Sequence, residues 1–193
     1  MPQIAADSLM TLEAYARERN AFRARVIAHK KHRKVPVGEH VTLIFEDELT
    51  IRYQVQEVLR IERIFEEDGI RGELAAYNPL IPDGGNWKAT MMIEYPDAQE
   101  RQRRLGELRG VEDRAWIQVE GCARVYAIAD EDLERETEEK TSSVHFLRFE
   151  LEPAMRAALK RGAALSVGID HSHYRAQTPV AAAARDSLAA DLA

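Results

Sequence analysis

The sequence predicts an α+β fold, in which a mostly antiparallel sheet of five or six strands is covered by helices. Two observations lead to this prediction. Helical and strand-like segments follow one another without the strict alternation that produces a parallel sheet, and residues 113–130 have the pattern of a β-hairpin. The chain has 193 residues, enough for one domain with a sizeable core, and we expect a single domain over residues 1–193.

Long helices are expected near both ends of the chain. Apolar residues recur at helical spacing through residues 9–33, and Pro36 ends that helix. The clearest helix spans residues 47–68, where one apolar stripe runs along its length. Thr178 and Pro179 begin an alanine-rich C-terminal helix. Shorter helices are predicted at 69–76, 97–110 and 153–162.

Strands are predicted where β-branched and apolar residues cluster or alternate, at 41–47, 87–95, 142–151 and 164–174. The hairpin at 113–130 has its turn at Glu120, Gly121 and Cys122. The strands at 142–151 and 164–174 are either antiparallel neighbours or the two ends of a parallel crossover. The intervening dozen or so residues with their helix favour the parallel crossover.

Composition narrows the class of protein. The net charge of −6 argues against a general nucleic-acid binder. No stretch approaches the roughly 18 uninterrupted apolar residues of a transmembrane helix, and the N-terminal residues lack the pattern of a secretory signal. With Cys122 as the single cysteine, no internal disulfide can form. These features lead us to expect a cytoplasmic protein that binds neither membranes nor nucleic acids.

Charge is unevenly distributed along the chain. Residues 17–34 contain eight lysines and arginines against one acidic residue, and residues 130–140 contain seven acidic residues against two basic ones. Such runs commonly form solvated faces. Alternatively, the basic run docks an acidic protein partner or the 130–139 segment of a second copy. Its main contributors in that case are Lys30, Lys31, Arg33 and Lys34.

Three histidines are candidate metal ligands. On a strand, His171 and His173 point to the same face, and two imidazoles on one strand can chelate zinc or iron. A third ligand must come from elsewhere, and His145 is in phase with the inward-facing residues of its own strand. If the two strands form a parallel crossover, however, His145 lies at the opposite end of the sheet, roughly 20 Å away. A polar strand end explains the same residues without a metal.

Two further regions have the composition of ligand sites. The helix at 47–68 carries a polar row that includes Arg52 and Gln56, with Tyr53 beside it. This row is either an exposed helix face or the lining of a groove. Around the glycine pair at 84–85, Trp87 fits a buried plug at the start of a strand. Any site at this loop would include Tyr77, Asn78 and Lys88.

Three long stretches resemble a bacterial family catalogued as domain of unknown function 3501. They are "IRYQVQEVLRIERI" (51–64), "LAAYNPLIPDGGNWKATMMIEY" (74–95) and "VYAIADEDLERETEEKTSSVHFLRFEL" (125–151). The resemblance implies a cytoplasmic protein of similar length with no established activity or catalytic residues. Genes of that family often lie beside those of a rubrerythrin-like protein and an iron–sulfur oxidoreductase, which implies a role in oxidative-stress or anaerobic redox metabolism. The similar stretches contain most of the candidate residues above and add Arg148.

These observations predict a non-enzymatic accessory or binding protein that works with a redox partner and needs no cofactor of its own. The alternative is a metal-dependent or small-molecule-converting enzyme that uses His145, His171, His173 and nearby arginines.

Overall fold

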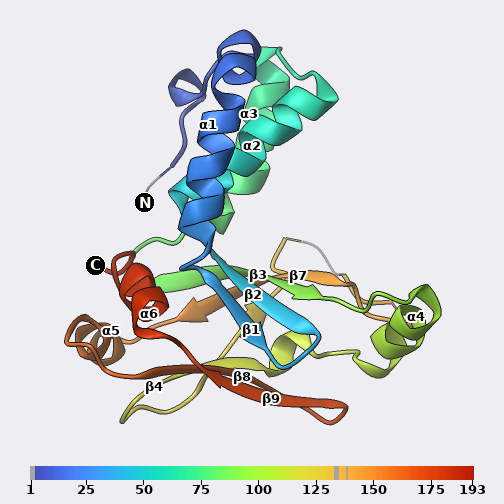
Figure 1. The fold of residues 1–193 in the computed structure, drawn as a ribbon, viewed down its shortest axis with the longest axis vertical. Helices are drawn as coiled ribbons and strands as arrows, with labels where there is room; N and C mark the ends of the chain where they lie inside the picture. The colour runs from blue at the N-terminus through green and yellow to red at the C-terminus, as the bar shows by residue number, and fades with distance from the viewer. Residues whose placement is uncertain (1–2, 133–134, 138) are drawn as a thin grey trace.

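The computed structural model describes residues 3–132, 135–137 and 139–193. It consists of a helical part standing on a part built from two β-sheets (Figure 1). We call residues 3–30 and 48–80 the helical lobe and the remainder the sheet lobe. The helical lobe is therefore made of two chain segments, separated by the first two strands of the sheet lobe.

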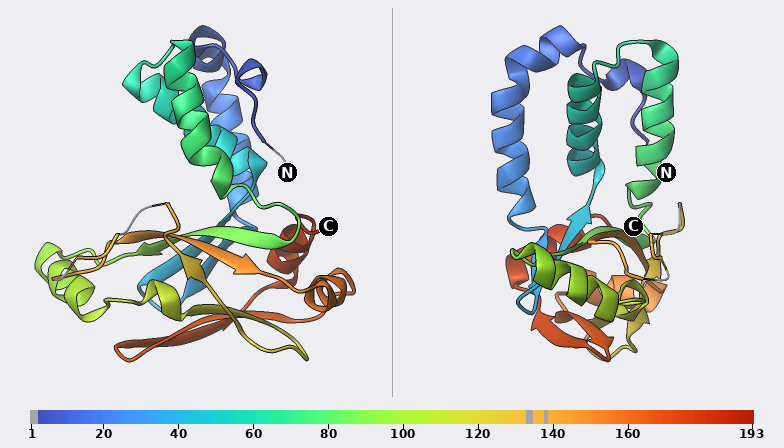
Figure 2. Two further views of the ribbon diagram at one scale, coloured as in Figure 1. Left: turned by 180° about the vertical axis from the view of Figure 1, so that it is seen from behind. Right: turned by 90° about the vertical axis from the view of Figure 1, so that its right-hand side faces the viewer.

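Both sheets are antiparallel throughout, and they lie one above the other in the sheet lobe (Figure 2). The upper sheet has the order β1-β2-β3-β7-β6 and the lower sheet the order β5-β4-β8-β9. The strands are β1 Lys34–Val37, β2 Val41–Glu46, β3 Asn86–Ile93, β4 Ala115–Val119, β5 Val125–Tyr126, β6 Ile128–Ala129, β7 Val144–Glu150, β8 Leu165–His171 and β9 Tyr174–Pro179.

The main core lies between the two sheets. Alternate residues of β3, such as Ala89 and Met91, are buried there, while Lys88 and Thr90 face the other way. Ile117 and Val167 of the lower sheet meet them from below. Because side chains alternate between the faces of a strand, the outer face of the upper sheet is left for residues that meet the helical lobe.

The helical lobe contains α1 Leu12–Lys30, α2 Glu48–Glu62 and α3 Glu67–Tyr77, with short 3-10 helices at Ala6–Ser8 and Asn78–Leu80. Asp47 caps α2 by accepting a hydrogen bond from the Thr50 amide at 2.9 Å. Ile51, Val55 and Leu59 of α2 form a small core with α3. The other face of the lobe buries Tyr15, Phe22 and Val26 of α1.

Three further helices lie at the edges of the sheets: α4 Ala98–Glu107, α5 Pro153–Lys160 and α6 Ala182–Ala189. Leu188 of α6 and Leu159 of α5 are buried in the main core. Trp87 on β3 donates a hydrogen bond from Nε1 to the Leu188 carbonyl at 2.9 Å, which joins α6 to the upper sheet.

The predicted α+β class and the antiparallel sheets are confirmed, but the strands form two sheets where one was expected. The strand expected at 164–174 ends at His171, and residues 174–179, expected to lead into a helix, form β9. In β9, half-buried Tyr174 and Ala176 alternate with exposed Arg175 and Gln177. The C-terminal helix is accordingly shorter than expected. Since β7 and β8 belong to different sheets, neither predicted pairing of these strands is present.

The predicted exposure of one residue in the basic run is wrong. Arg33 was expected on a solvated face, but its side chain is only 1% exposed. Its guanidinium donates to the carbonyls of Phe45 at 2.9 Å and Glu46 at 3.1 Å, and it pairs with Asp191. Arg33 is therefore a core residue at the junction of the two lobes, because buried arginines are stabilised by such complete pairing.

Trp87 is 1% exposed, as predicted, and contacts Phe45 edge-on at 5.8 Å between ring centroids. We predict that Trp87→Ala lowers the free energy of unfolding by about 3–5 kcal/mol, because truncating a buried aromatic residue leaves a cavity. Chemical denaturation of the two proteins measures this difference. A variant as stable as the parent would contradict a structural role for the indole.

Candidate functional site

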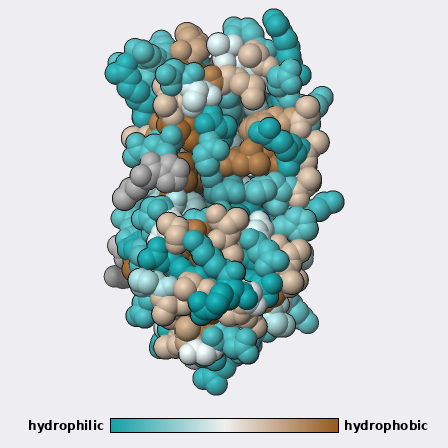
Figure 3. All heavy atoms as spheres, turned by 90° about the vertical axis from the view of Figure 1, so that its left-hand side faces the viewer, coloured by the Kyte–Doolittle hydropathy of each residue, from teal (hydrophilic) through white to brown (hydrophobic). Residues whose placement is uncertain are grey.

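A cleft opens where the helical lobe meets the outer face of the upper sheet. Its two adjoining compartments have volumes of about 310 and 530 Å³, which is the size of a small-molecule site. The space-filling view shows hydrophobic residues at the surface of the helical lobe, above the level at which the two lobes meet (Figure 3). We call this space the junction cleft. Four residues line both compartments: Ala75, Pro79, Lys88 and Arg148.

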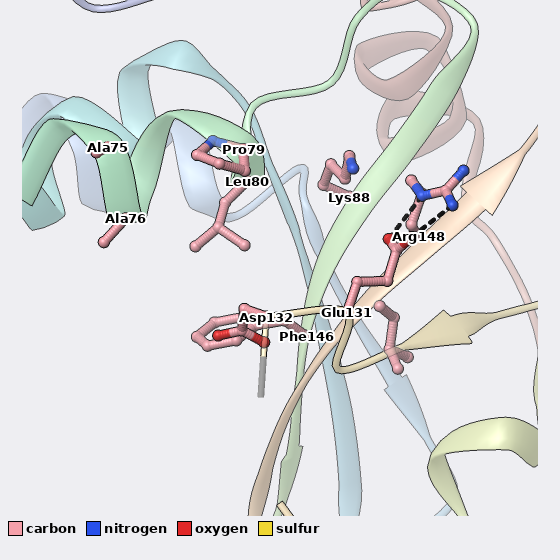
Figure 4. Close-up of a pocket in the computed structure, with 10 residues that line it drawn as sticks. Ala75, Ala76, Pro79, Leu80, Lys88, Glu131, Asp132, Phe146 and Arg148 are labelled. Carbon is pink, nitrogen blue, oxygen red and sulfur yellow. Dashed lines mark hydrogen bonds and ion pairs between the residues drawn. The ribbon is translucent and has the colours of Figure 1, made fainter. Parts of the chain in front are cut away.

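The wall contributed by the helical lobe is apolar. Ala75 and Ala76 come from the last turns of α3, and Pro79 and Leu80 come from the 3-10 helix that follows (Figure 4). On the sheet side, half-buried Phe146 of β7 lines the same compartment. A ligand in this compartment thus meets hydrocarbon on two sides.

The polar side of the junction cleft is organised around Arg148 of β7. Its Nε and Nη2 both donate to the Glu131 carboxylate at 2.7 Å, and its Nη1 pairs with Glu150. The hydrogen bonds that Arg148 donates to Glu131 raise the pKa of Arg148, and the same contact lowers the pKa of Glu131. Arg148 is therefore held in place by two carboxylates and has little capacity left for an anionic ligand.

Lys88 lies directly across from Arg148 in the pairing of β3 with β7. Its side chain lies between the helical wall and Arg148 (Figure 4). Over the residues that the structure describes, the Lys88 side chain makes neither a hydrogen bond nor an ion pair, and the residue is half-buried. Burial, with the nearby Arg148 charge, lowers the pKa of Lys88. Lys88 is thus the cation of the junction cleft that is available to a ligand.

The second compartment is more polar. Asn86 donates to Glu150 at 3.1 Å, and its Oδ1 accepts a hydrogen bond from the Asp83 amide at 3.3 Å. Asn78 fastens the N-terminal segment by a pair of hydrogen bonds with the backbone of Ile4, at 2.9 and 3.1 Å. These contacts fix the rim of the cleft and leave its interior to Lys88.

The candidate residues of α2 lie away from the junction cleft. Arg52 pairs with Glu48 and donates to the Ser8 carbonyl at 2.8 Å. Tyr53 packs on Phe22 with ring centroids 6.0 Å apart. Fully buried Gln56 exchanges hydrogen bonds with the backbone of Met10 at 2.8 and 3.3 Å. These side chains hold the N-terminal segment and α1 against α2.

The residues predicted near the glycine pair divide into two groups. Lys88 and Asn78 line the junction cleft, whereas Trp87 points into the core on the opposite face of β3. Tyr77 packs on the core of the helical lobe, and burial raises the pKa of its hydroxyl. The loop thus provides both the structural plug and part of the lining of the junction cleft, although the prediction treated plug and site as alternatives.

His145 lies in a buried polar cluster with Glu112 and Asp130. The possible ligand atoms of these three residues lie within 4.8 Å of one another. His145 Nδ1 is 2.5 Å from Asp130, while Nε2 lies 3.0 Å from both Thr141 Oγ1 and the Ser142 carbonyl. Burial raises the pKa of Glu112. Both ring nitrogens already have partners, so hydrogen bonding accounts for the whole cluster.

His171 and His173 do not join His145 in a donor cluster among the described residues. A turn at residues 172–173 ends the strand and leaves His173 exposed, although its ring still lies near that of His171, with 5.8 Å between the ring centroids. His171 Nε2 bonds to the Arg109 carbonyl at 2.9 Å, and its Nδ1 accepts from the His173 amide at 3.2 Å. Burial lowers the pKa of His171, which favours the neutral ring.

The prediction missed the apolar wall of the junction cleft and the carboxylates that hold Arg148. One signal was present in the sequence: Phe146 and Arg148 occupy the outward-facing positions of β7, where an aromatic residue indicates a covered surface. No local signal placed Ala76 or Leu80 opposite them, because that approach depends on how the two lobes meet.

Comparisons with known proteins identify relatives but no activity. A family model described as "Protein of unknown function (DUF3501)" matches residues 3–192. A crystal structure from Burkholderia pseudomallei K96243, described as a novel protein of unknown function, is 57% identical, with 100% of both chains covered and a TM-score of 0.95. No curated protein matches the chain. In the part of the chain that the structure describes, no helix is long and apolar enough to cross a membrane.

We predict that the purified protein carries less than about one tenth of an equivalent of zinc or iron, because both nitrogens of His145 are engaged in hydrogen bonds. Elemental analysis of the protein as isolated tests this. Near-stoichiometric metal that disappears in His145→Ala, but is retained in the double variant His171→Ala, His173→Ala, would instead assign a metal centre to the cluster with Glu112 and Asp130.

Proposed function

The chain belongs to the family of proteins of unknown function DUF3501, and from that premise we propose that it is a cytoplasmic, non-enzymatic binding protein whose ligand occupies the junction cleft. One observation carries the proposal. Lys88 is a half-buried cation whose side chain has no partner among the described residues, at the floor of a small-molecule-sized space with an apolar wall.

The lining indicates a ligand with an apolar body and one polar end. The alanines of α3, Leu80 and Phe146 offer contact surface, which favours transfer of hydrocarbon from water. The polar end would lie at Lys88, since Arg148 is already bound by Glu131 and Glu150. A strongly anionic ligand is disfavoured because it would have to displace these carboxylates.

We predict that the neutral fluorescent probe 1-aminoanthracene binds in the junction cleft and that Ala76→Phe weakens its binding about tenfold or more, equivalent to about 1.4 kcal/mol. The added ring fills space that the probe needs. Fluorescence titration measures both affinities. Ala24→Phe, the same change at an exposed alanine of α1, serves as the control and should bind like the parent. Equal binding by parent and Ala76→Phe would contradict the proposal.

A second surface supports the proposal of a protein partner. Arg17, Arg23, Lys31 and Lys34 are exposed, and none forms an ion pair within the described residues. Lys30 is half-buried beside them. Arg19, by contrast, is bound to Glu57 at 2.7 Å, and Arg33 is buried. Arg25 lies over the Phe22 ring, 4.9 Å from its centroid. We call the remaining residues of this group (Arg17, Arg23, Lys30, Lys31 and Lys34) the basic face of α1.

The basic face of α1 favours a distinct acidic protein over a second copy of this chain. In the acidic segment, Asp130 pairs with His145, Glu131 with Arg148, and Glu136 with Arg109. These carboxylates are engaged within their own chain. The redox proteins implied by the family resemblance are the partners we propose to test first.

We predict that docking weakens as salt rises, since exposed charges are screened over about 10 Å at 0.1 M ionic strength. Sedimentation with candidate redox proteins of the host, at low and high salt, measures it. Reversing Lys30, Lys31 and Lys34 to Glu should abolish association, whereas Lys160→Glu with Arg161→Glu, exposed bases on α5 and its end, should not. Association that is absent at low salt, or that survives the first reversal, would leave the basic face as an ordinary solvated surface.

A further inference from the structure

We infer that the ligand of the junction cleft is a small neutral aldehyde or ketone and that Lys88 Nζ binds it covalently as an imine. The inference rests on the proposed function and specifies its ligand chemistry. It starts from the position of Lys88, a primary amine that faces an apolar wall and has no partner within the described residues.

The charges around Lys88 select the class of ligand. Asp83, Glu131 and Glu150 all act on the ammonium as nearby negative charges, and Arg148 as a nearby positive charge. The junction cleft therefore has a surplus of carboxylates and requires one cation at this place. An anion bound to Lys88 would remove that balance, whereas a neutral carbonyl compound brings no charge into the cleft.

Imine formation preserves this balance. The Lys88 amine attacks the carbonyl carbon, and the carbonyl oxygen then leaves as water with the two hydrogens that the ammonium nitrogen gives up. The carbon–oxygen double bond is replaced by a carbon–nitrogen double bond, and no oxidant or reductant takes part. The protonated imine has the same single positive charge as the ammonium, so the flanking carboxylates keep their counterion.

The surroundings also favour the reactive form of the amine. A lysine becomes nucleophilic when it is desolvated or lies beside another cation, and Lys88 satisfies both conditions. The apolar part of the carbonyl compound would rest on Leu80 and Phe146. Binding and reactivity thus converge at one side chain, which distinguishes Lys88 from the exposed lysines Lys31, Lys34 and Lys160.

Reductive trapping tests the inference. The full-length protein is incubated at pH 7 with butyraldehyde and cyanoborohydride, and labelling of each lysine is followed by peptide mass spectrometry. We expect Lys88 to be labelled several-fold faster than Lys31, Lys34 and Lys160. Lys88→Arg should lose the fast label. A parallel reaction with formaldehyde, which needs no apolar wall, reports the intrinsic reactivity of each amine.

Ala76→Phe separates binding from bare reactivity. It should abolish the preference of butyraldehyde for Lys88 while formaldehyde still labels Lys88 as in the parent. If Lys88 reacts no faster than the exposed lysines, the covalent inference is wrong, and 1-aminoanthracene titration then shows independently whether the cleft binds a ligand. If the preference for Lys88 is the same for both aldehydes and survives Ala76→Phe, Lys88 is merely a reactive amine and the inference is likewise overturned.

Discussion

The buried guanidinium of Arg33 fixes how the two lobes meet. It lies just after α1 and donates to the carbonyls of Phe45 and Glu46 at the end of β2. It also pairs with Asp191 beyond α6 and lies 3.4 Å from Asp47, the residue that caps α2. Burial alone would raise the pKa of Asp47, but Arg33 and its other partners hold that pKa below its usual value. Two helices, a strand and the C-terminal segment thus meet at one charge.

Removing one partner of such a group leaves an uncompensated buried charge, which typically costs about 3–5 kcal/mol. The contact also has a geometric role. The junction cleft exists only because α3 and its following turn stand at a set distance from the outer face of the upper sheet. That distance depends on how the chain runs from α1 through β1 and β2 into α2. Arg33 fixes this part of the chain, because it contacts both the end of β2 and Asp47 at the start of α2.

Local patterns were sufficient for most elements and insufficient for their assembly. The alternation at 87–95 identified β3 and assigned Trp87 to the core, because strand periodicity depends on neighbouring residues alone. The division into two sheets was not predictable in this way, since it depends on contacts between residues far apart in sequence, such as Ile117 with Val167. Arg33 was misjudged for the same reason. Its partners at 45–47 and 191 lie outside any local window, and a basic run normally indicates solvent.

The candidate site shows the same division. Lys88 and Asn78 were among the predicted residues because polar groups near a glycine turn are visible locally, and Arg148 was included because it lies in a stretch that resembles the family. The apolar wall that α3 contributes to the cleft could not be predicted from the sequence, because alanines on a short helix have no distinctive pattern. The histidine hypothesis depended on a strand pairing that the two-sheet topology does not contain. His145 instead forms hydrogen bonds with the Asp130 carboxylate and with the backbone carbonyl of Ser142.

The chain passes between the lobes three times, at residues 30–34, 46–48 and 80–86. Three short tethers, unlike one, leave the helical lobe little freedom to rotate on the sheets. A ligand entering the junction cleft therefore meets walls that are already in position, and little conformational entropy is lost when it binds. The ligand would insert into a rigid cleft, and the size of its apolar part would set the selectivity. The association rate would not be limited by a conformational closure of the protein.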